Sequence, residues 1–150
     1  MTGSDQMDAE RAFTRMVRAR RRAALSRSLH RIPRHAGGRL RVYADLDDAR
    51  RRGGARTPGP RVREIPLEAI EGTVEPSRAA AFDAAFRPAP AARTRWQRVW
   101  LAEHRGQVLP PISVVPVGEG YAVRDGHHRV SVARARGALM IDATVETLPA

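Results

Sequence analysis

The sequence contains no cysteine and no long apolar run, and both absences exclude whole classes of protein. Without cysteine the chain has no disulfide, no thiolate metal ligand and no cysteine nucleophile. Because no run of about 18 apolar residues occurs, no segment is expected to span a membrane. The first residues, MTGSDQMDAERAF, lack the basic and apolar regions of a secretory signal. These absences predict a cytoplasmic protein without a membrane partner.

Lysine is also absent, so the positive charge of the chain rests entirely on arginine. The 27 arginines outnumber 16 acidic residues and give a net charge of +11 over 150 residues. Arginine without lysine, together with 25 alanines, is typical of a GC-rich coding bias, which explains the residue type but not the excess. Residues 1–60 hold a net charge of +9 and residues 61–150 hold +2. GGARTPGP at 53–60 has the composition of a linker, so we predict a basic helical N-terminal extension over 1–60 and a domain over 61–150.

The N-terminal extension is predicted to begin with a long helix over residues 10–32. Its apolar residues recur at steps of three and four, which places them on one stripe: Phe13, Met16, Val17, Ala24, Leu25, Leu29 and Ile32. Pro33 ends the helix. A short strand over 40–43 follows, and then a helix over 46–52 that Asp45 caps.

The arginines of this helix have two interpretations. Arg18, Arg20, Arg21 and Arg22 are candidate nucleic-acid contacts, because arginine neutralises phosphate, and DNA is then a candidate partner. No aromatic residue is interleaved with them, so no base-stacking surface is expected. Alternatively, they form the solvated face of a helix that packs on the domain, or on a second copy of the chain, through its apolar stripe.

Residues 61–150 alternate between strand and helix patterns, which predicts an α+β domain with a small mixed sheet. We expect a strand and turn over 62–70, a polar turn over 72–74, an alanine-rich helix from Ser77 with Phe82 and Phe86 on one face, and a helix from Thr94 with Trp96, Val99 and Trp100 in the core. A hairpin of strands 112–117 and 121–124, a helix over 127–136 and a strand over 140–145 complete the pattern.

The segment Asp125-Gly126-His127-His128-Arg129 joins the second hairpin strand to the next helix, and it carries the chemistry of the sequence. Gly126 permits close backbone approach, and the first N–H groups of the helix have no intrahelical acceptor. Those N–H groups, the positive end of the helix and the Arg129 guanidinium converge on one place, which predicts an anion site suited to phosphate. His127 and His128 can donate hydrogen bonds there, and histidine can transfer protons near neutral pH.

Two other interpretations of this segment stay open at this point. Asp125 could cap the helix, with Gly126 as an ordinary turn residue. Asp125 and His127 could supply two metal ligands, but adjacent histidines point about 100° apart on a helix and no third ligand is evident. No metal site is therefore expected.

The stretch LPPISVVPVGEGYAVRDGHHRVSVARARGALMIDATV, with IPLEAIEGTVEPSRAAAFDAAF before it, resembles the ParB/sulfiredoxin superfamily over about residues 62–148. The resemblance implies that superfamily's small mixed sheet with packed helices. It also implies a nucleotide site, since the Asp-Gly-His-His-Arg form is similar to the turn of its free serine kinases, and the equivalent turn in the ParB branch holds the phosphates of CTP. Gly126 and Arg129 match the phosphate-binding positions, His128 matches the preceding donor, and Thr73 and Arg78 match a second phosphate-contacting segment.

The sequence departs from the superfamily in ways that limit the expected activity. His127 stands where ParB-type CTPases have glutamate, and the missing cysteine excludes sulfiredoxin chemistry. The serine kinases use an early glutamate, for which Glu71 and Glu75 are candidates; with Asp125 they are the carboxylates that could act as a base or hold Mg²⁺. The chain reaches Ala150 soon after the superfamily core, so we expect no helix-turn-helix.

We therefore expect a ParB-like nucleotide-binding module. The alternatives are a phosphotransferase or nuclease that uses the same site, and a DNA-binding accessory that uses the basic N-terminal helix.

Overall fold

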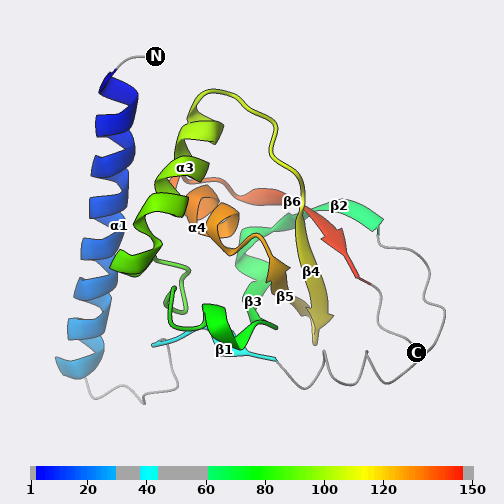
Figure 1. Cartoon of the computed structure of the whole chain (residues 1–150). Coiled ribbons are helices and arrows are strands. Elements are labelled where there is room, and N and C mark those ends of the chain that lie inside the picture. Colours follow the sequence, from blue (N-terminus) through cyan, green and yellow to red (C-terminus); the bar gives the residue numbers. More distant parts are fainter. Residues whose placement is uncertain (1–2, 30–37, 44–60, 147–150) are drawn as a thin grey trace.

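The computed structural model describes residues 3–29, 38–43 and 61–146 (Figure 1). Three α-helices are described: α1 (Gly3–Leu29), α3 (Arg93–His104) and α4 (His127–Ala135). The strands are β1 (Arg41–Val42), β2 (Arg61–Pro66), β3 (Ile70–Thr73), β4 (Ile112–Val117), β5 (Gly120–Asp125) and β6 (Met140–Val145). Short 3-10 turns lie at Leu67–Ala69, Pro76–Arg78 and Pro90–Ala92. The predicted α+β class is confirmed. The predicted helix over 46–52 and the linker over 53–60 lie outside the described residues.

The six strands form one mixed sheet in the order β1-β3-β5-β4-β6-β2. The predicted hairpin is confirmed: β4 and β5 are antiparallel, and a turn at Gly118 connects them. β3 lies parallel to β5, and Thr73 is in register with Val123. Because parallel neighbours end at the same edge of a sheet, the carboxyl ends of β3 and β5 lie side by side.

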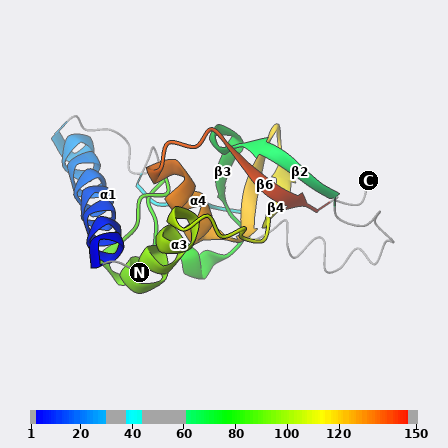
Figure 2. The same cartoon turned by 90° about the horizontal axis from the view of Figure 1, so that it is seen from above.

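The helices cover one face of the sheet, and the main core lies between them (Figure 2). Trp96 of α3 is fully buried, as predicted; its ring lies 5.5 Å from that of Phe13 in α1, and its Nε1 donates to Ser131 Oγ in α4 at 2.8 Å. The other face of the sheet holds a smaller apolar cluster: Val74, Val115, Val117 and Ala122, with Tyr43 against it. α1 thus packs into the same core as α3 and α4.

The long N-terminal helix begins at Gly3, seven residues before the predicted start. The sequence pattern missed this part because alanine adds little to an apolar stripe, yet Ala9 is fully buried where α1 meets α3. The predicted stripe is buried only in its first half. Phe13 is fully buried, whereas Leu25 is 59% and Leu29 80% exposed. Ile32 and Pro33 lie outside the described residues.

The predicted turn over 72–74 is wrong, because Gly72 and Thr73 belong to β3. Glycine is needed here because the neighbouring strand β1 comes very close to it, with Arg41 paired to Gly72. A Cβ at position 72 would lie 2.2 Å from the Arg41 carbonyl oxygen. The polar composition that indicated a turn instead permits two strands to approach closely.

The predicted alanine-rich helix from Ser77 is also wrong, because residues 79–89 form turns. The Asp83 side chain accepts hydrogen bonds from the backbone N–H groups of Ala85 and Arg87, at 3.0 and 2.8 Å. Such bonds compete with helix formation. Phe86 accordingly has a φ of 59°, and Phe82 and Phe86 still meet, with ring centroids 6.2 Å apart. The spacing of Phe82 and Phe86 correctly predicted that their rings meet, but the helical backbone that it predicted is not formed.

Within the described residues, no helix is both long enough and apolar enough to span a membrane.

Candidate functional site

The turn between β5 and α4 is built around Gly126. β5 ends at Asp125, Gly126 has a φ of 107°, and α4 begins at His127. A Cβ at position 126 would lie 2.5 Å from Ile112 Cγ2, so both the backbone conformation and the space require glycine. This arrangement starts the helix immediately after the strand, as the sequence predicts.

The amino-terminal end of α4 leaves backbone donors available. The first bond of the helix runs from Val130 N–H to Gly126 O at 3.0 Å, so the N–H groups of His127, His128 and Arg129 have no intrahelical acceptor. No side chain caps this end, and Asp125 does not fill that role. The helix dipole adds positive potential at the same place.

A pocket of about 300 Å³ opens in front of this helix end. Its lining is mainly cationic or hydrogen-bonding: Arg78, Arg95, Val99, Leu109, Pro110, Asp125, Gly126, His127, His128 and Arg129. The sequence analysis named most of these residues but missed Arg95, whose place depends on how α3 packs on α4. Asp125 is the one acidic residue in the lining.

The three arginines of the pocket differ in their partners. Arg129 donates to the backbone oxygens of Pro110 and Pro111, and to Asp125 Oδ2 at 3.2 Å. Its side chain is only 16% exposed, so it clamps the start of β4 to the start of α4. In the described part of the chain, Arg78 and Arg95 form no ion pair. These two guanidinium groups are therefore the ones left for an anion.

The two histidines of the pocket are held in their neutral form. Burial, followed by the positive charge of Arg78, lowers the pKa of His127 to about 4. Burial, followed by the charges of Arg95 and Arg78, lowers the pKa of His128 to about 4. Phe82 supports both rings, stacked on His127 at 6.2 Å and edge-on to His128 at 5.1 Å. At neutral pH both histidines offer hydrogen bonds without adding charge.

Thr73 lies behind His127. Its side chain is fully buried, and its Oγ1 lies 2.6 Å from His127 Nε2. The same oxygen accepts the Glu75 N–H at 2.9 Å and lies 3.2 Å from Val123 O. A hydroxyl donates one hydrogen bond, so the tautomer of His127 depends on whether Thr73 donates to His127 Nε2 or to a backbone oxygen, that of Val123 or of Glu75. Thr73, which the resemblance assigned to phosphate contact, is placed to orient His127.

The candidate carboxylates are not brought together. Glu71 Oε2 accepts a hydrogen bond from Tyr43 OH at 3.3 Å, and Glu71 lies beside Gly120, at the start of β5 and far along that strand from Asp125. Glu75 contacts Thr73 through its backbone and does not line the pocket. Asp125 lines the pocket but is paired with Arg129.

Comparison with known proteins gives one kind of match. No family model matches the chain, and no curated protein matches it. Solved structures do match. One is the crystal structure of sulfiredoxin from Arabidopsis thaliana, with a TM-score of 0.39 and 21% sequence identity over 59% of this chain and 86% of that chain. At this level of similarity the match assigns no role to any residue of the pocket.

Proposed function

We propose that this protein binds a phosphate-bearing small molecule, of the nucleotide class, in the pocket at the amino-terminal end of α4. The observation that carries the proposal is the convergence of Arg78 and Arg95, without ion pairs in the described structure, on the free N–H groups of a helix. Guanidinium groups and helix amino termini are the two commonest ways in which proteins hold phosphate.

The size and composition of the pocket favour a phosphate group over an apolar ligand. About 300 Å³ is at the low end for ligand pockets, enough for the phosphates and part of the group attached to them. Two arginines, helix N–H groups and two neutral histidines supply many donors to the several oxygens of a phosphate chain. A carboxylate would use only part of this set.

A Mg²⁺ ion fits this pocket only as the companion of a nucleotide. Magnesium prefers oxygen ligands, and Asp125, the one carboxylate in the lining, is held by Arg129. The phosphate oxygens of the nucleotide, and not side chains of the protein, would therefore supply most of the ligands of the ion. When bound, the ion would offset phosphate charge, while Arg78 and Arg95 hold the remaining oxygens.

Binding is favoured over catalysis by the position of the carboxylates. Phosphoryl transfer or phosphodiester hydrolysis needs a group that accepts a proton beside the reacting phosphate. Glu71 and Glu75 do not line the pocket, and His127 has one ring nitrogen engaged with Thr73. A phosphotransferase or nuclease is the second candidate function. His128 and Asp125 are the pocket residues that could accept the proton in such a reaction.

A thermal-shift panel tests the proposal and identifies the ligand class. The full chain is heated with nucleoside triphosphates, nucleoside diphosphates, pyrophosphate or inorganic phosphate, each with and without Mg²⁺. Binding at a hundredfold excess over Kd stabilises the protein by about 2.7 kcal/mol, which raises Tm by several degrees. A nucleotide that raises Tm more than pyrophosphate supports the proposal. No shift with any phosphate compound would refute it.

A further inference from the structure

The outward face of α1 carries a concentration of positive charge that the pocket does not use. From Arg11 to Leu29 the helix holds seven arginines and no acidic residue. They are Arg11, Arg15, Arg18, Arg20, Arg21, Arg22 and Arg27. Arg20 donates to Ala80 O at 3.4 Å, and Arg11 pairs with Asp8 at 3.8 Å. The other five form no ion pair with any described residue.

Helix geometry places three of these side chains in a row. At about 100° per residue, Arg15, Arg18 and Arg22 fall within about 60° of arc, on the side of α1 opposite Ala9 and Phe13. They span about 10 Å along the axis. All three are exposed, whereas Ala9 and Phe13 on the opposite side are buried. We call Arg15, Arg18 and Arg22 the arginine ridge.

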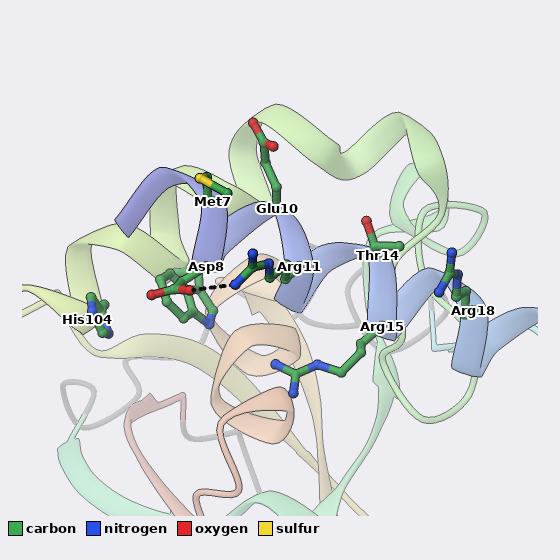
Figure 3. A pocket seen from close by; sticks show the side chains of 9 residues that line it. Met7, Asp8, Glu10, Arg11, Thr14, Arg15, Arg18 and His104 are labelled. Carbon is green, nitrogen blue, oxygen red and sulfur yellow. Dashed lines mark ion pairs between the residues drawn. The ribbon is translucent and has the colours of Figure 1, made fainter. Parts of the chain in front are cut away.

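The first part of α1 differs from the ridge because its charges are balanced. Asp5 pairs with His104 and with Arg105 at the end of α3. Asp8 pairs with Arg11 (Figure 3). Figure 3 shows Arg15 and Arg18 further along the same helix, past the last acidic residue, Glu10. Uncompensated charge therefore begins at Arg15 and continues toward the carboxyl end of the helix.

We propose that the arginine ridge binds the phosphate backbone of a double-stranded nucleic acid. A row of exposed guanidinium groups with no acid among them matches a regular array of phosphates, and each contact releases counterions. No aromatic side chain accompanies the ridge on α1, so the contact would be with the backbone and independent of base sequence.

A lipid surface fits the ridge less well. A helix that lies in a membrane interface buries a continuous apolar face. In α1 the apolar residues Ala9, Ala12 and Phe13 are already buried against α3 and the sheet. Beyond the ridge, the large apolar residues that α1 exposes are Leu25 and Leu29, which do not form a continuous face.

Fluorescence anisotropy with the full chain tests this proposal. The probes are a duplex DNA and a duplex RNA of equal length, titrated from about 50 mM to about 200 mM salt. The variant R18Q/R22Q is compared with R61Q/R63Q, which removes the same charge from two exposed positions of β2. We expect R18Q/R22Q to make the slope of log Kobs against log salt shallower by about 1.8, and R61Q/R63Q to leave it unchanged.

Three results would overturn the proposal. Wild type could fail to bind either duplex at low salt, or the two variants could lose affinity equally, which would show dependence on net charge alone. Vesicles of anionic lipid could also be bound more tightly than either duplex, with R18Q/R22Q abolishing that binding. Equal melting temperatures of the two variants, measured by circular dichroism, establish that both are folded.

Discussion

The pocket at α4 and the arginine ridge on α1 are both cationic, but they present charge in opposite ways. In the pocket, arginines from two separate segments converge with a helix end on a space of about 300 Å³, and nearby histidines are kept neutral. On the ridge, arginines of a single helix lie side by side and face solvent. Convergent charge suits one small anion, whereas a row of charge suits a repeating polyanion.

The difference also concerns how much structure each region needs. The pocket depends on the fold at several points: the glycine turn, the buried Thr73, the ring of Phe82 and the clamp of Arg129. The ridge depends only on the helix. Changes that disturb buried groups should therefore affect the pocket strongly and the ridge little.

We expect the largest loss in the free energy of unfolding when the pH is lowered. In the unfolded chain a histidine takes up a proton near pH 6.5, but His127 and His128 do so only near pH 4 in the folded protein. Their stabilisation is complete above pH 6.5 and is lost as the pH falls toward 4, by up to about 3 kcal/mol for the buried His127 and by less for the more exposed His128. Urea unfolding from pH 7 to pH 4 should show this decrease in wild type and in H104Q. A decrease of equal size in H127Q/H128Q would contradict it.

The next effect is that of Gly126→Ala. The added Cβ meets Ile112 at 2.5 Å in a left-handed backbone conformation, so we expect a loss of about 4 kcal/mol in the free energy of unfolding. Gly137→Ala is the matched control, because Gly137 has a φ of +77° with open space around it. That variant should cost about 1 kcal/mol. Similar losses in chemical denaturation would show that the packing at Gly126 is not what constrains the turn.

A smaller effect is expected for Thr73→Val. The change removes the partner of His127 Nε2 and the acceptor of the Glu75 N–H, at a cost of about 2 kcal/mol. Thr73→Ser keeps the hydroxyl and should recover ligand affinity, whereas Thr73→Val should not. Nitrogen chemical shifts of His127 report its tautomer in both variants. Unchanged shifts in Thr73→Val would mean that Thr73 does not orient the ring.

We expect the smallest change in stability when arginines of the ridge are replaced. R18Q/R22Q removes two exposed side chains, so its free energy of unfolding should stay within about 0.5 kcal/mol of wild type. Its affinity for nucleotide should also be unchanged. A loss of nucleotide affinity in this variant would mean that ridge and pocket are not separate sites.

The sequence predicts the regular elements of the carboxyl-terminal half well. Strands β4, β5 and β6 and helix α4 have strong alternation or periodicity, bounded by glycines, and all occur near the expected positions. The turn at Gly126 was also predictable, because glycine between a strand pattern and a helix pattern permits the backbone to turn sharply. These features depend on residues that are close together in the sequence, so the sequence pattern predicts them.

The errors fall where distant parts of the chain decide the structure. Gly72 is needed because the paired strand β1 lies so close to it, and residues 79–89 are not helical because Asp83 binds the nearby backbone. Arg95 reaches the pocket only through the packing of α3 on α4. Arg129, the residue that the sequence favours most for phosphate, is largely engaged with Pro110, Pro111 and Asp125. No local pattern could assign those partners.

Calorimetric titration of the full chain measures whether the pocket at α4 holds phosphate; the ligand is the nucleotide that gives the largest increase in Tm. The variant R78Q/R95Q removes the two pocket arginines that form no ion pair within the described residues, and R61Q/R63Q removes equal charge from β2. We predict that R61Q/R63Q binds as wild type does, and that R78Q/R95Q loses at least about a hundredfold in affinity, since charge-assisted bonds contribute about 1.5–3 kcal/mol each. Equal affinity of R78Q/R95Q and wild type would contradict the assignment of this pocket.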